Sequence, residues 1–372
     1  MLTSKTHPFR ILTITTIART NEVFLADINE RLSNFDHYAA AIDMSESLAK
    51  KYYKATLNLS MSRSYRAVLS IKKVRHELQY FVEEHEIDLI HVHTPIAAFI
   101  VRYIFRNYLT AKKQKLPIVY TAHGFHFFPG NSVLKNWIYL TLEKISAAWT
   151  DKLIVINNTD YFAALKYKMI RPEKLLQIPG IGIDLSLYKC APNEYSRSNK
   201  KSFLCIAEFI PRKNHRDIII ALKKTKQDFS IKFAGDGELL QSIQNLVSKL
   251  DLDTRVEFLG YRDDIVKLID ECDGLILVSS QEGLPRSILE GMSMGKIIIG
   301  SNIRGIKDLL EYGAGILVEV GDTTALAQMM DDIIINPDNY NAMKYKAGKA
   351  SIKYDVNNIV RIHEDLYNEL IF

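Results

Sequence analysis

The chain has 372 residues, of which 47% are apolar and 24% are charged, a composition typical of globular proteins that excludes disordered, collagen-like and coiled-coil chains. The length suits two domains of about 100–200 residues each. Three cysteines are too few and too scattered for a disulfide framework or a structural zinc site. No run approaches about 18 apolar residues, and the N-terminus lacks the apolar core of a signal peptide, so we expect a cytoplasmic protein without a membrane-spanning helix.

Charge is unevenly distributed along the chain. Residues 1–190 hold 25 Lys and Arg against 16 Asp and Glu, a net charge of +9, whereas residues 191–372 hold 23 against 27, a net charge of −4. A basic half favours anionic partners such as nucleic acid, anionic lipid or phosphorylated substrates, although a solvated surface without a partner has the same composition. No nucleic-acid-binding motif accompanies the charge, so we do not expect nucleic acid.

Short apolar runs alternate with amphipathic stretches along the whole chain. Continuous apolar runs are typical of strands that are buried on both faces of a parallel sheet. The predicted strands are residues 10–17, 88–93, 118–121, 152–156, 202–207, 230–234, 255–259, 274–278, 296–300 and 315–318. The clearest predicted helices are residues 66–85, 133–148, 214–226 and 238–250.

This alternation predicts an α/β protein with two Rossmann-like, doubly wound domains that face a central crevice. The polar segment 187–201 marks the boundary, which gives domains at residues 1–188 and 189–354. The tail, residues 355–372, has apolar residues at helical spacing, and we expect it to pack back on the first domain. Ligands bind at the carboxyl ends of strands in such folds, so chemistry is expected there.

The most informative motif is EGLPRSILE, from Glu282 to Glu290, directly after a predicted strand. Pro285 suits the first turn of a helix, and Gly283 and the free amides at that helix start can bind an anion. Two carboxylates beside these amides suit a phosphorylated sugar, because carboxylates accept hydroxyl hydrogen bonds while amides hold phosphate. The alternative is that both acids are exposed at a helix end.

Basic residues and glycines follow other predicted strands of the second half. Arg212 and Lys213 open a helix after the first of these strands, where they could neutralise a diphosphate or form a basic surface turn. The loops of the next two strands could contact a ligand or be simple turns and helix entries. Their candidate residues are Gly235, Gly237, Tyr261, Arg262 and Ile265.

In the first half, the segment YTAHGFHFF follows a predicted strand. His123 sits beside a glycine at that strand end and could bind a sugar or take part in proton transfer. His126 lies between aromatic residues, and a packed ring is the more natural prediction for it than for His123. Asp251 and Asp253 form a D-x-D pair at the strand edge away from the crevice, so we expect no metal ion.

Together these motifs make the chain resemble the retaining GT-B glycosyltransferases of glycosyltransferase family 4. The resemblance covers nearly the whole chain and rests on the ordered set RKNH, GDGELL, FLGYRDDI and SSQEGLPRSILEGMSMGK. The first half, with IHVHTPIA, YTAHGFHF, INNTDY and IPGIGIDLSLY, is similar to a bacterial branch that builds exopolysaccharide and capsule on lipid carriers. The family implies that the first domain binds the acceptor and the second binds the nucleotide sugar.

The resemblance also implies roles for individual residues. Glu282 would contact the donor sugar hydroxyls, Gly283, Leu284 and Pro285 would lie along the sugar and diphosphate, and Glu290 would bind the ribose. Lys213 would bind the diphosphate with Arg212 as its helper. The LGYRDDI loop, with Tyr261, Arg262 and Ile265, would recognise the base, and His123 would lie near the reacting sugar carbon.

Two positions depart from the family pattern. Glu208 stands where a basic residue usually follows the first strand of the second domain, so one phosphate contact is missing or supplied by Arg212. The glycine-rich loop expected after the first strand reads TTIARTNE, in which Arg19 is a candidate substitute. Arg19 and His126 are the candidate residues on the acceptor side.

The resemblance implies transfer of a hexose or N-acetylhexosamine from a nucleotide sugar, UDP-linked, to a polyprenyl-diphosphate-linked saccharide, without a cofactor. The alternatives are a soluble protein or glycan acceptor, a sugar-nucleotide epimerase and a silent subunit that binds nucleotide sugar or lipid. A nicotinamide enzyme ranks below these, since no G-x-G-x-x-G follows a strand.

A lipid-linked acceptor would also explain the basic first half. Residues 62–75 and 102–115 mix Arg and Lys with apolar residues and could lie on an anionic membrane surface, at the inner face of the cell membrane. Residues 133–149, with Trp137 and Trp149, form a third amphipathic stretch, for which core packing is the expected role. The sequence leaves the oligomeric state open.

Overall fold

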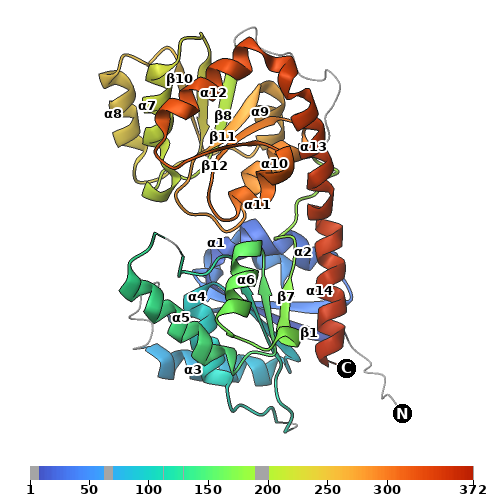
Figure 1. Cartoon of the computed structure of the whole chain (residues 1–372). Coiled ribbons are helices and arrows are strands. Elements are labelled where there is room, and N and C mark those ends of the chain that lie inside the picture. The colour runs from blue at the N-terminus through green and yellow to red at the C-terminus, as the bar shows by residue number, and fades with distance from the viewer. Residues whose placement is uncertain (1–7, 63–69, 112, 129, 189–200, 372) are drawn as a thin grey trace. The chain divides into compact units, whose positions relative to one another are not determined.

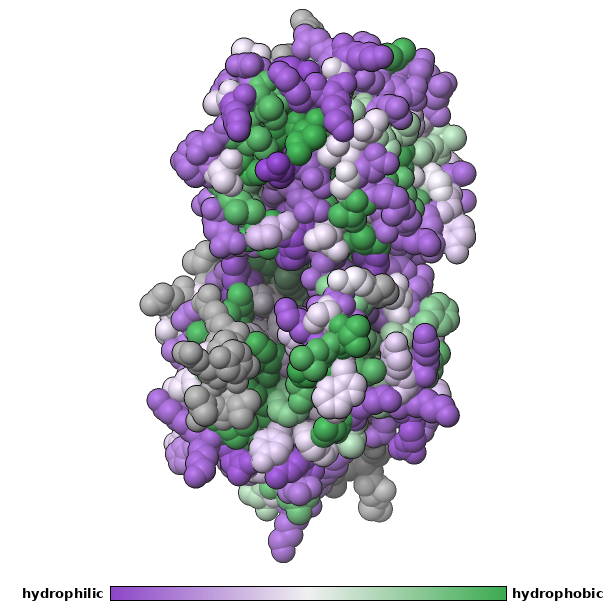
Figure 2. All heavy atoms as spheres, turned by 60° about the vertical axis from the view of Figure 1, so that its left-hand side comes forward, coloured by the Kyte–Doolittle hydropathy of each residue, from purple (hydrophilic) through white to green (hydrophobic). Residues whose placement is uncertain are grey.

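The computed structural model describes residues 8–62, 70–111, 113–128, 130–188 and 201–371, which divide into two compact units (Figure 1). The first unit comprises Met1–Gly182 and Val356–Phe372, and the second comprises Ile183–Asp355. The expected connection at 187–201 lies mostly outside the described residues. Polar and apolar residues both reach the surface of each unit on the face drawn in Figure 2.

The described part of the first unit holds a seven-stranded parallel sheet in the order β3-β2-β1-β4-β5-β6-β7. The strand order reverses between β1 and β4. The strands are β1 (Phe9–Ile17), β2 (Phe35–Ile42), β3 (Ala55–Asn58), β4 (Leu89–His93), β5 (Ile118–Ala122), β6 (Lys152–Val155) and β7 (Leu175–Gln177).

Right-handed crossovers assign the helices of the first unit to two faces of this sheet. One face carries α3 (Ile71–Glu84), α4 (Pro95–Phe105), α5 (Val133–Ala147) and α6 (Asn158–Lys166). The other carries α1 (Ala18–Thr20), α2 (Ala26–Arg31) and α14 (Val356–Ile371), which packs on α2. The chain tail therefore completes the first unit, through the buried side chains of Ile359, His363, Leu366 and Tyr367.

The described part of the second unit holds a six-stranded parallel sheet in the order β10-β9-β8-β11-β12-β13. Here the strand order reverses between β8 and β11. The strands are β8 (Ser202–Ile206), β9 (Ser230–Ala234), β10 (Val256–Gly260), β11 (Gly274–Leu277), β12 (Ile297–Ser301) and β13 (Ile316–Val318). The helices are α7 (His215–Lys224), α8 (Leu240–Lys249), α9 (Ile265–Glu271), α10 (Arg286–Ser293), α11 (Ile306–Leu310), α12 (Thr323–Ile335) and α13 (Asn341–Ser351).

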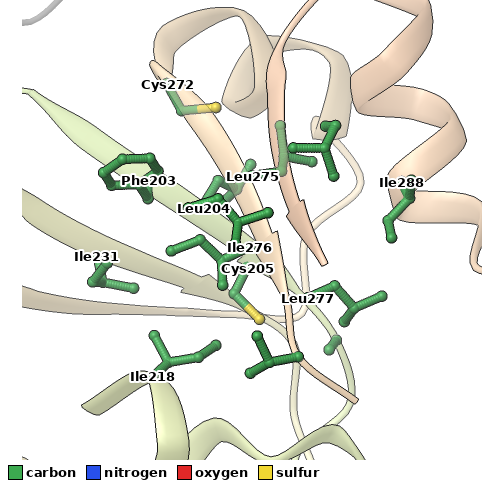
Figure 3. Packing of buried hydrophobic residues seen from close by; sticks show 14 of the residues in the cluster. Phe203, Leu204, Cys205, Ile218, Ile231, Cys272, Leu275, Ile276, Leu277 and Ile288 are labelled. Atoms are coloured by element: carbon green, nitrogen blue, oxygen red, sulfur yellow. The ribbon is translucent and has the colours of Figure 1, made fainter. Parts of the chain in front are cut away.

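The core of the second unit is continuous on both faces of its sheet. In Figure 3, side chains of β8 and β11 lie side by side, with Ile218 of α7 and Ile288 of α10 on opposite sides of them. Cys205 and Cys272 are free and buried in this core. Burial of both strand faces is the reason for the uninterrupted apolar runs in the sequence.

The predicted fold class is confirmed: both units are Rossmann-like α/β domains with parallel sheets. Every predicted strand is present to within two residues at each end. Three strands were missed, because β2 is rich in alanine, while β3 and β7 are short edge strands with four and three residues. The predicted helix at 66–85 begins at Ile71 in the described residues.

Candidate functional site

Two loops at the carboxyl edge of the second sheet form the main cluster of candidate residues. One loop follows β8 and the other follows β11, the neighbouring strands at which the strand order reverses. In parallel α/β sheets, ligands bind at such a reversal, beside the carboxyl ends of the strands. The topology therefore brings together two motifs that lie about 70 residues apart, as the spacing of Lys213 and Glu282 shows.

Lys213 and Glu282 form a close ion pair at this place. The Lys213 Nζ atom lies 2.5 Å from Glu282 Oε1, and both side chains are largely buried. Arg212 reaches the second oxygen, with NH1 3.4 Å from Oε2, and also donates to the Gln281 carbonyl oxygen at 3.2 Å. One carboxylate thus faces two cations, and these three side chains carry one net positive charge.

Hydrogen bonds to backbone carbonyl oxygens hold the two loops against each other. The Ser280 amide donates to the Arg212 carbonyl oxygen at 2.8 Å, and the Asn214 side-chain amide donates to the Val278 carbonyl oxygen at 3.1 Å. Asn214 adopts a left-handed conformation with φ of 52°, which ends the Pro211–Lys213 turn before α7 begins. These contacts fix the positions of the two loops that carry the ion pair.

Glu290, the second acid of the motif, lies on the inner side of α10. Its Oε1 atom accepts hydrogen bonds from the Tyr188 hydroxyl at 2.7 Å and from Arg286 Nε at 2.9 Å. Burial raises the pKa of the Glu290 carboxyl, and Arg286 and Tyr188 oppose that rise. The alternative of two exposed helix-end acids is therefore wrong, since Glu282 and Glu290 are 7% and 6% exposed.

The glycine positions pack closely against neighbouring loops. A Cβ atom at Gly235 would lie 2.0 Å from the Ala207 carbonyl oxygen, and one at Gly237 would lie 2.7 Å from the Phe209 amide nitrogen. Both glycines pack against the loop after β8, which carries Arg212 and Lys213. Gly305 does the same for the loop after β11, because its Cβ would lie 2.1 Å from the Gly283 carbonyl oxygen. The glycines therefore support the loop backbones.

The segment predicted to recognise a base follows β10, the edge strand of this sheet. Tyr261 is 73% exposed, and Arg262 pairs with Asp264, its Nε 2.7 Å from Oδ1. The hydrogen bond and charge of Asp264 raise the pKa of Arg262. Ile265 begins α9 and is partly buried. Glu208, the departure from the family pattern, has an exposed side chain in the loop after β8.

The first unit carries its own cluster, built from histidines at the ends of β4 and β5. His123 Nε2 lies 3.0 Å from His93 Nδ1, and the rings of His93 and His91 lie 4.1 Å apart. His91 in turn lies 2.6 Å from the Tyr367 hydroxyl of α14 and 2.7 Å from the Thr121 hydroxyl. Burial, with repulsion from His363, lowers the pKa of His123 to about 4, so the ring is neutral near pH 7.

The structure reverses the expected burial of the two histidines in YTAHGFHFF. His126, expected to pack, has an exposed side chain whose ring meets Tyr139 edge to face at 5.3 Å. His123 is the partly buried, hydrogen-bonded one. The reason lies in the sheet: His93 at the end of β4 sits beside β5 and bonds to His123, a contact between residues 30 positions apart.

Arg19 and Thr94 lie at the reversal point of the first sheet. Arg19, expected in place of a glycine-rich loop, is exposed on the helical turn α1 after β1. Thr94 has a positive φ of 66°, which is strained for a threonine, and its hydroxyl lies 2.6 Å from the Thr16 hydroxyl and accepts from the Thr16 amide at 3.0 Å. This bridge joins the ends of β1 and β4.

Several side chains that complete these clusters were not among the predicted site residues. Tyr188 and Arg286 hold Glu290, Arg304 donates to the Glu282 carbonyl oxygen at 3.4 Å, and His93 and Thr94 shape the first-unit loops. Arg304 follows β12 and His93 ends β4, so their place at strand ends was a usable signal. Within the described residues, no group of three or more His, Cys, Asp or Glu is placed to hold a metal ion.

Comparison with known proteins agrees with this architecture. Residues 192–350 match the family model "Glycosyl transferases group 1", and residues 42–187 match "Glycosyltransferase Family 4". The protein EpsD of Bacillus subtilis (strain 168), provisionally named a glycosyltransferase, is 31% identical over 79% of this chain and 80% of its own length. The Escherichia coli UDP-Gal:alpha-D-GlcNAc-diphosphoundecaprenol alpha-1,3-galactosyltransferase is 26% identical over 88% of this chain and 86% of its own.

Solved structures share the fold. The crystal structure of Anabaena HepE in complex with UDP and glucose superposes with a TM-score of 0.79 at 21% identity, covering 97% of this chain and 100% of that one. With two parallel-sheet units, matches to both family models and a relative above 30% identity, the chain belongs to the group 1, family 4 glycosyltransferases of the GT-B fold and is a transferase.

Proposed function

We propose that this enzyme transfers a hexose or N-acetylhexosamine from a UDP-linked sugar to a polyprenyl-diphosphate-linked saccharide during the synthesis of a bacterial surface polysaccharide. The first unit takes the acceptor and the second takes the nucleotide sugar, at the inner face of the cell membrane. The observation that carries the proposal is the buried ion pair of Lys213 and Glu282, joined by Arg212, where the second sheet reverses its strand order.

This cluster suits a diphosphate because its charges can be exchanged. Arg212 and Lys213 both face Glu282. A diphosphate would take over these cations, and each charge-assisted hydrogen bond contributes about 1.5–3 kcal/mol. Glu282 would then be free to accept hydrogen bonds from sugar hydroxyls. The amides at the start of α10 also favour a bound diphosphate, since a helix N-terminus stabilises negative charge.

The chemistry we propose is attack on the face from which the diphosphate leaves, with retention at the anomeric carbon. A phosphate oxygen takes the acceptor proton, while Lys213 and Arg212 stabilise the charge that develops on the leaving group. The low pKa of His123 keeps its ring neutral, so it can hydrogen-bond to the sugar without repelling the positive charge on the reacting carbon. Glu290 is assigned to the ribose hydroxyls.

The relatives support the substrate classes. The Escherichia coli relative carries UDP-Gal and a diphosphoundecaprenol acceptor in its name, and the Anabaena neighbour was solved with UDP and glucose. UDP appears in both descriptions, and its diphosphate suits a site built from cations and helix amides. The basic charge of residues 1–190 also fits an acceptor that carries a diphosphate.

The test is turnover with a panel of nucleotide sugars, with and without a short polyprenyl-diphosphate-linked saccharide. Nucleotide release and the mass of the lipid product are followed together. The expected result is a mass gain of one sugar from one UDP-sugar, only when the lipid acceptor is present. Transfer to water-soluble glycans instead would replace the acceptor class, and UDP binding without transfer to any acceptor would favour a silent subunit.

A further inference from the structure

Helix α5 presents an unusually apolar outer face. Trp137 is 64% exposed, and the other apolar side chains of this face are also exposed, most of all Val133 at 86%. They recur at steps of three and four residues along the helix, which places them on one side. The set comprises Val133, Leu134, Trp137, Ile138, Leu142 and Ile145. The view that turns the left-hand side of Figure 1 forward shows apolar side chains gathered over the first unit (Figure 2).

The inner side of the same helix combines polar groups with Tyr139 and Leu140, which pack against the core of the unit. Glu143 is buried, with Oε2 3.0 Å from Arg102 NH2, and its other oxygen accepts from the Tyr120 hydroxyl at 3.0 Å. Asn136 donates to the Phe128 carbonyl oxygen at 2.9 Å and accepts from the Phe128 amide at 3.1 Å. The helix is therefore held to its unit by apolar packing together with hydrogen bonds and an ion pair. A second set of apolar side chains faces outward, where an ordinary surface helix carries polar ones.

The exposed charges on α5 itself have one sign. Lys135 and Lys144 are exposed on α5, and the single acid of the helix, Glu143, is turned inward to Arg102. The next crossover helix on the same face of the sheet, α6, repeats the pattern. Its Phe162 and Lys166 are exposed, whereas Asp160 is buried and accepts from the Phe125 amide at 3.1 Å. Apolar side chains bordered by lysines are complementary to an anionic lipid surface.

The sequence pointed to other segments for this role. Of residues 62–75, the stretch 63–69 lies outside the described residues. In residues 102–115, Arg102 is 1% exposed and paired with Glu143, and Ile104 and Phe105 are buried. Residues 102–105 therefore belong to the core, and the expectation for that part was wrong. Core packing of α5, the expected role, is wrong for its outer face.

We propose that the outer face of α5, extended by Phe162 and Lys166 of α6, docks on an anionic phospholipid bilayer. Trp137 and its apolar neighbours enter the region between headgroups and acyl chains, and Lys135 and Lys144 contact the headgroups. A second copy is a poorer occupant, because a self-complementary contact brings the lysine borders of two identical faces together. The inference builds on the proposed function, since a lipid-linked acceptor requires the enzyme at the membrane.

Tryptophan fluorescence tests this docking directly. The chain has two tryptophans, so Trp149→Phe leaves Trp137 as the single reporter. With vesicles of phosphatidylglycerol and phosphatidylcholine, Trp137 emission should shift to the blue and be quenched by brominated lipid. The shift should be weaker in high salt and with phosphatidylcholine alone. Unchanged emission with anionic vesicles would overturn the proposal.

Charge variants show whether this face carries the binding. The double variant Leu134→Glu, Ile145→Glu should weaken co-sedimentation with anionic vesicles by about tenfold or more, because two apolar side chains are lost from the interface. Lys135→Gln with Lys144→Gln should weaken it by roughly tenfold or more. Tyr312→Glu, at an 89% exposed aromatic of the second unit, is the matched control and should bind as the natural chain does. Equal binding by all variants would refute the assignment.

The outcome is independent of the sugar chemistry. If vesicles bind but no sugar is transferred to a detergent-solubilised acceptor, the docking surface stands and the proposed function fails. If transfer proceeds in detergent but α5 variants bind vesicles normally, the docking proposal fails alone. A dimer in solution that buries Trp137 without lipid, and that Leu134→Glu separates, would assign this face to a second copy and overturn the proposal.

Discussion

Lys213 and Arg212 share one carboxylate, but their surroundings separate their roles. The Lys213 side chain is 13% exposed and lies 2.5 Å from Glu282, whereas Arg212 is 44% exposed and lies 3.4 Å away. A buried cation interacts more strongly with a bound anion than an exposed one, because water screens it less. Lys213 is therefore the stronger candidate for the leaving-group contact.

We expect Lys213→Ala to lower kcat by about 100-fold or more, the usual loss when one preorganised contact to developing charge is removed. Arg212→Ala should cost less and act mainly through KM. Circular dichroism and thermal unfolding check that both variants fold. Activity near that of the natural chain in a folded Lys213→Ala protein would reject this role.

Glu290 depends on its partners for its charge. Burial raises the pKa of its carboxyl, and the hydroxyl of Tyr188 and the guanidinium of Arg286 hold it down. Tyr188 stands 102 positions from Glu290 in the chain, so this support is visible only in the folded unit. Tyr188 is therefore a positioning residue for the Glu290 carboxylate, which we assign to the ribose.

The prediction for Tyr188→Phe is a pH-dependent loss of UDP affinity. Without the hydroxyl, the pKa of Glu290 should rise further, so its protonated form should appear at a higher pH than in the natural chain. UDP affinity, measured by calorimetry, should then begin to fall at a higher pH than in the natural chain. A parallel pH profile in both proteins would contradict the role of Tyr188, and far-UV circular dichroism checks the fold.

At the scale of elements, loops are positioned by backbone contacts between neighbouring strand ends. Gly235 has a positive φ of 153°, and the carbonyl oxygen of Ala207 occupies the place of a Cβ. Helix α5 shows the same dependence on neighbours, because its inward side meets Arg102 of α4 through Glu143 and the core of the unit through Tyr139 and Leu140.

Gly235→Ala should therefore destabilise the second unit by about 1–3 kcal/mol, from the contact with Ala207 together with the strained conformation. Gly348→Ala is the matched control. It lies within α13, and the atom nearest to its Cβ is 3.8 Å away, so a gain of up to about 1 kcal/mol is expected. Urea unfolding followed by circular dichroism distinguishes the two, and equal midpoints would contradict the packing argument.

At the scale of the whole molecule, helix α14 returns to the first unit and packs on it. His363 and Tyr367 of α14 lie beside His91 of β4, so this unit needs residues from both ends of the sequence. Burial lowers the pKa of His91, His93 and His363, and of His123 to about 4. No helix in the described residues is both long and apolar enough to cross a membrane.

These histidines predict the pH dependence of stability for the first unit. In the unfolded chain they bind protons below their ordinary pKa of about 6.5, whereas in the folded unit they stay neutral to lower pH. The unfolded state thus holds more protons, so stability is full above about pH 6.5 and falls as the pH drops towards about 4, by up to about 1.4 kcal/mol per pH unit for each histidine.

Both tryptophans lie in the first unit, so their fluorescence follows its unfolding in urea. The midpoint should fall between pH 7 and pH 5.5. His363→Gln should make this fall shallower, because one of the buried histidines is then missing. A midpoint that does not move over this range would refute the argument.

The sequence by itself determined the parallel α/β fold, most of the strands and the motifs at the strand ends, because these depend on local patterns of apolar residues, glycine and proline. Only the tertiary structure decided the burial of Glu282 and Glu290, the pairing of His123 with His93 and the outward face of α5. Burial and electrostatic environment depend on side chains brought from distant positions, such as Tyr188 beside Glu290 and Tyr367 beside His91. A periodic pattern shows that a helix has two faces, whereas its packing partners decide which of them meets water.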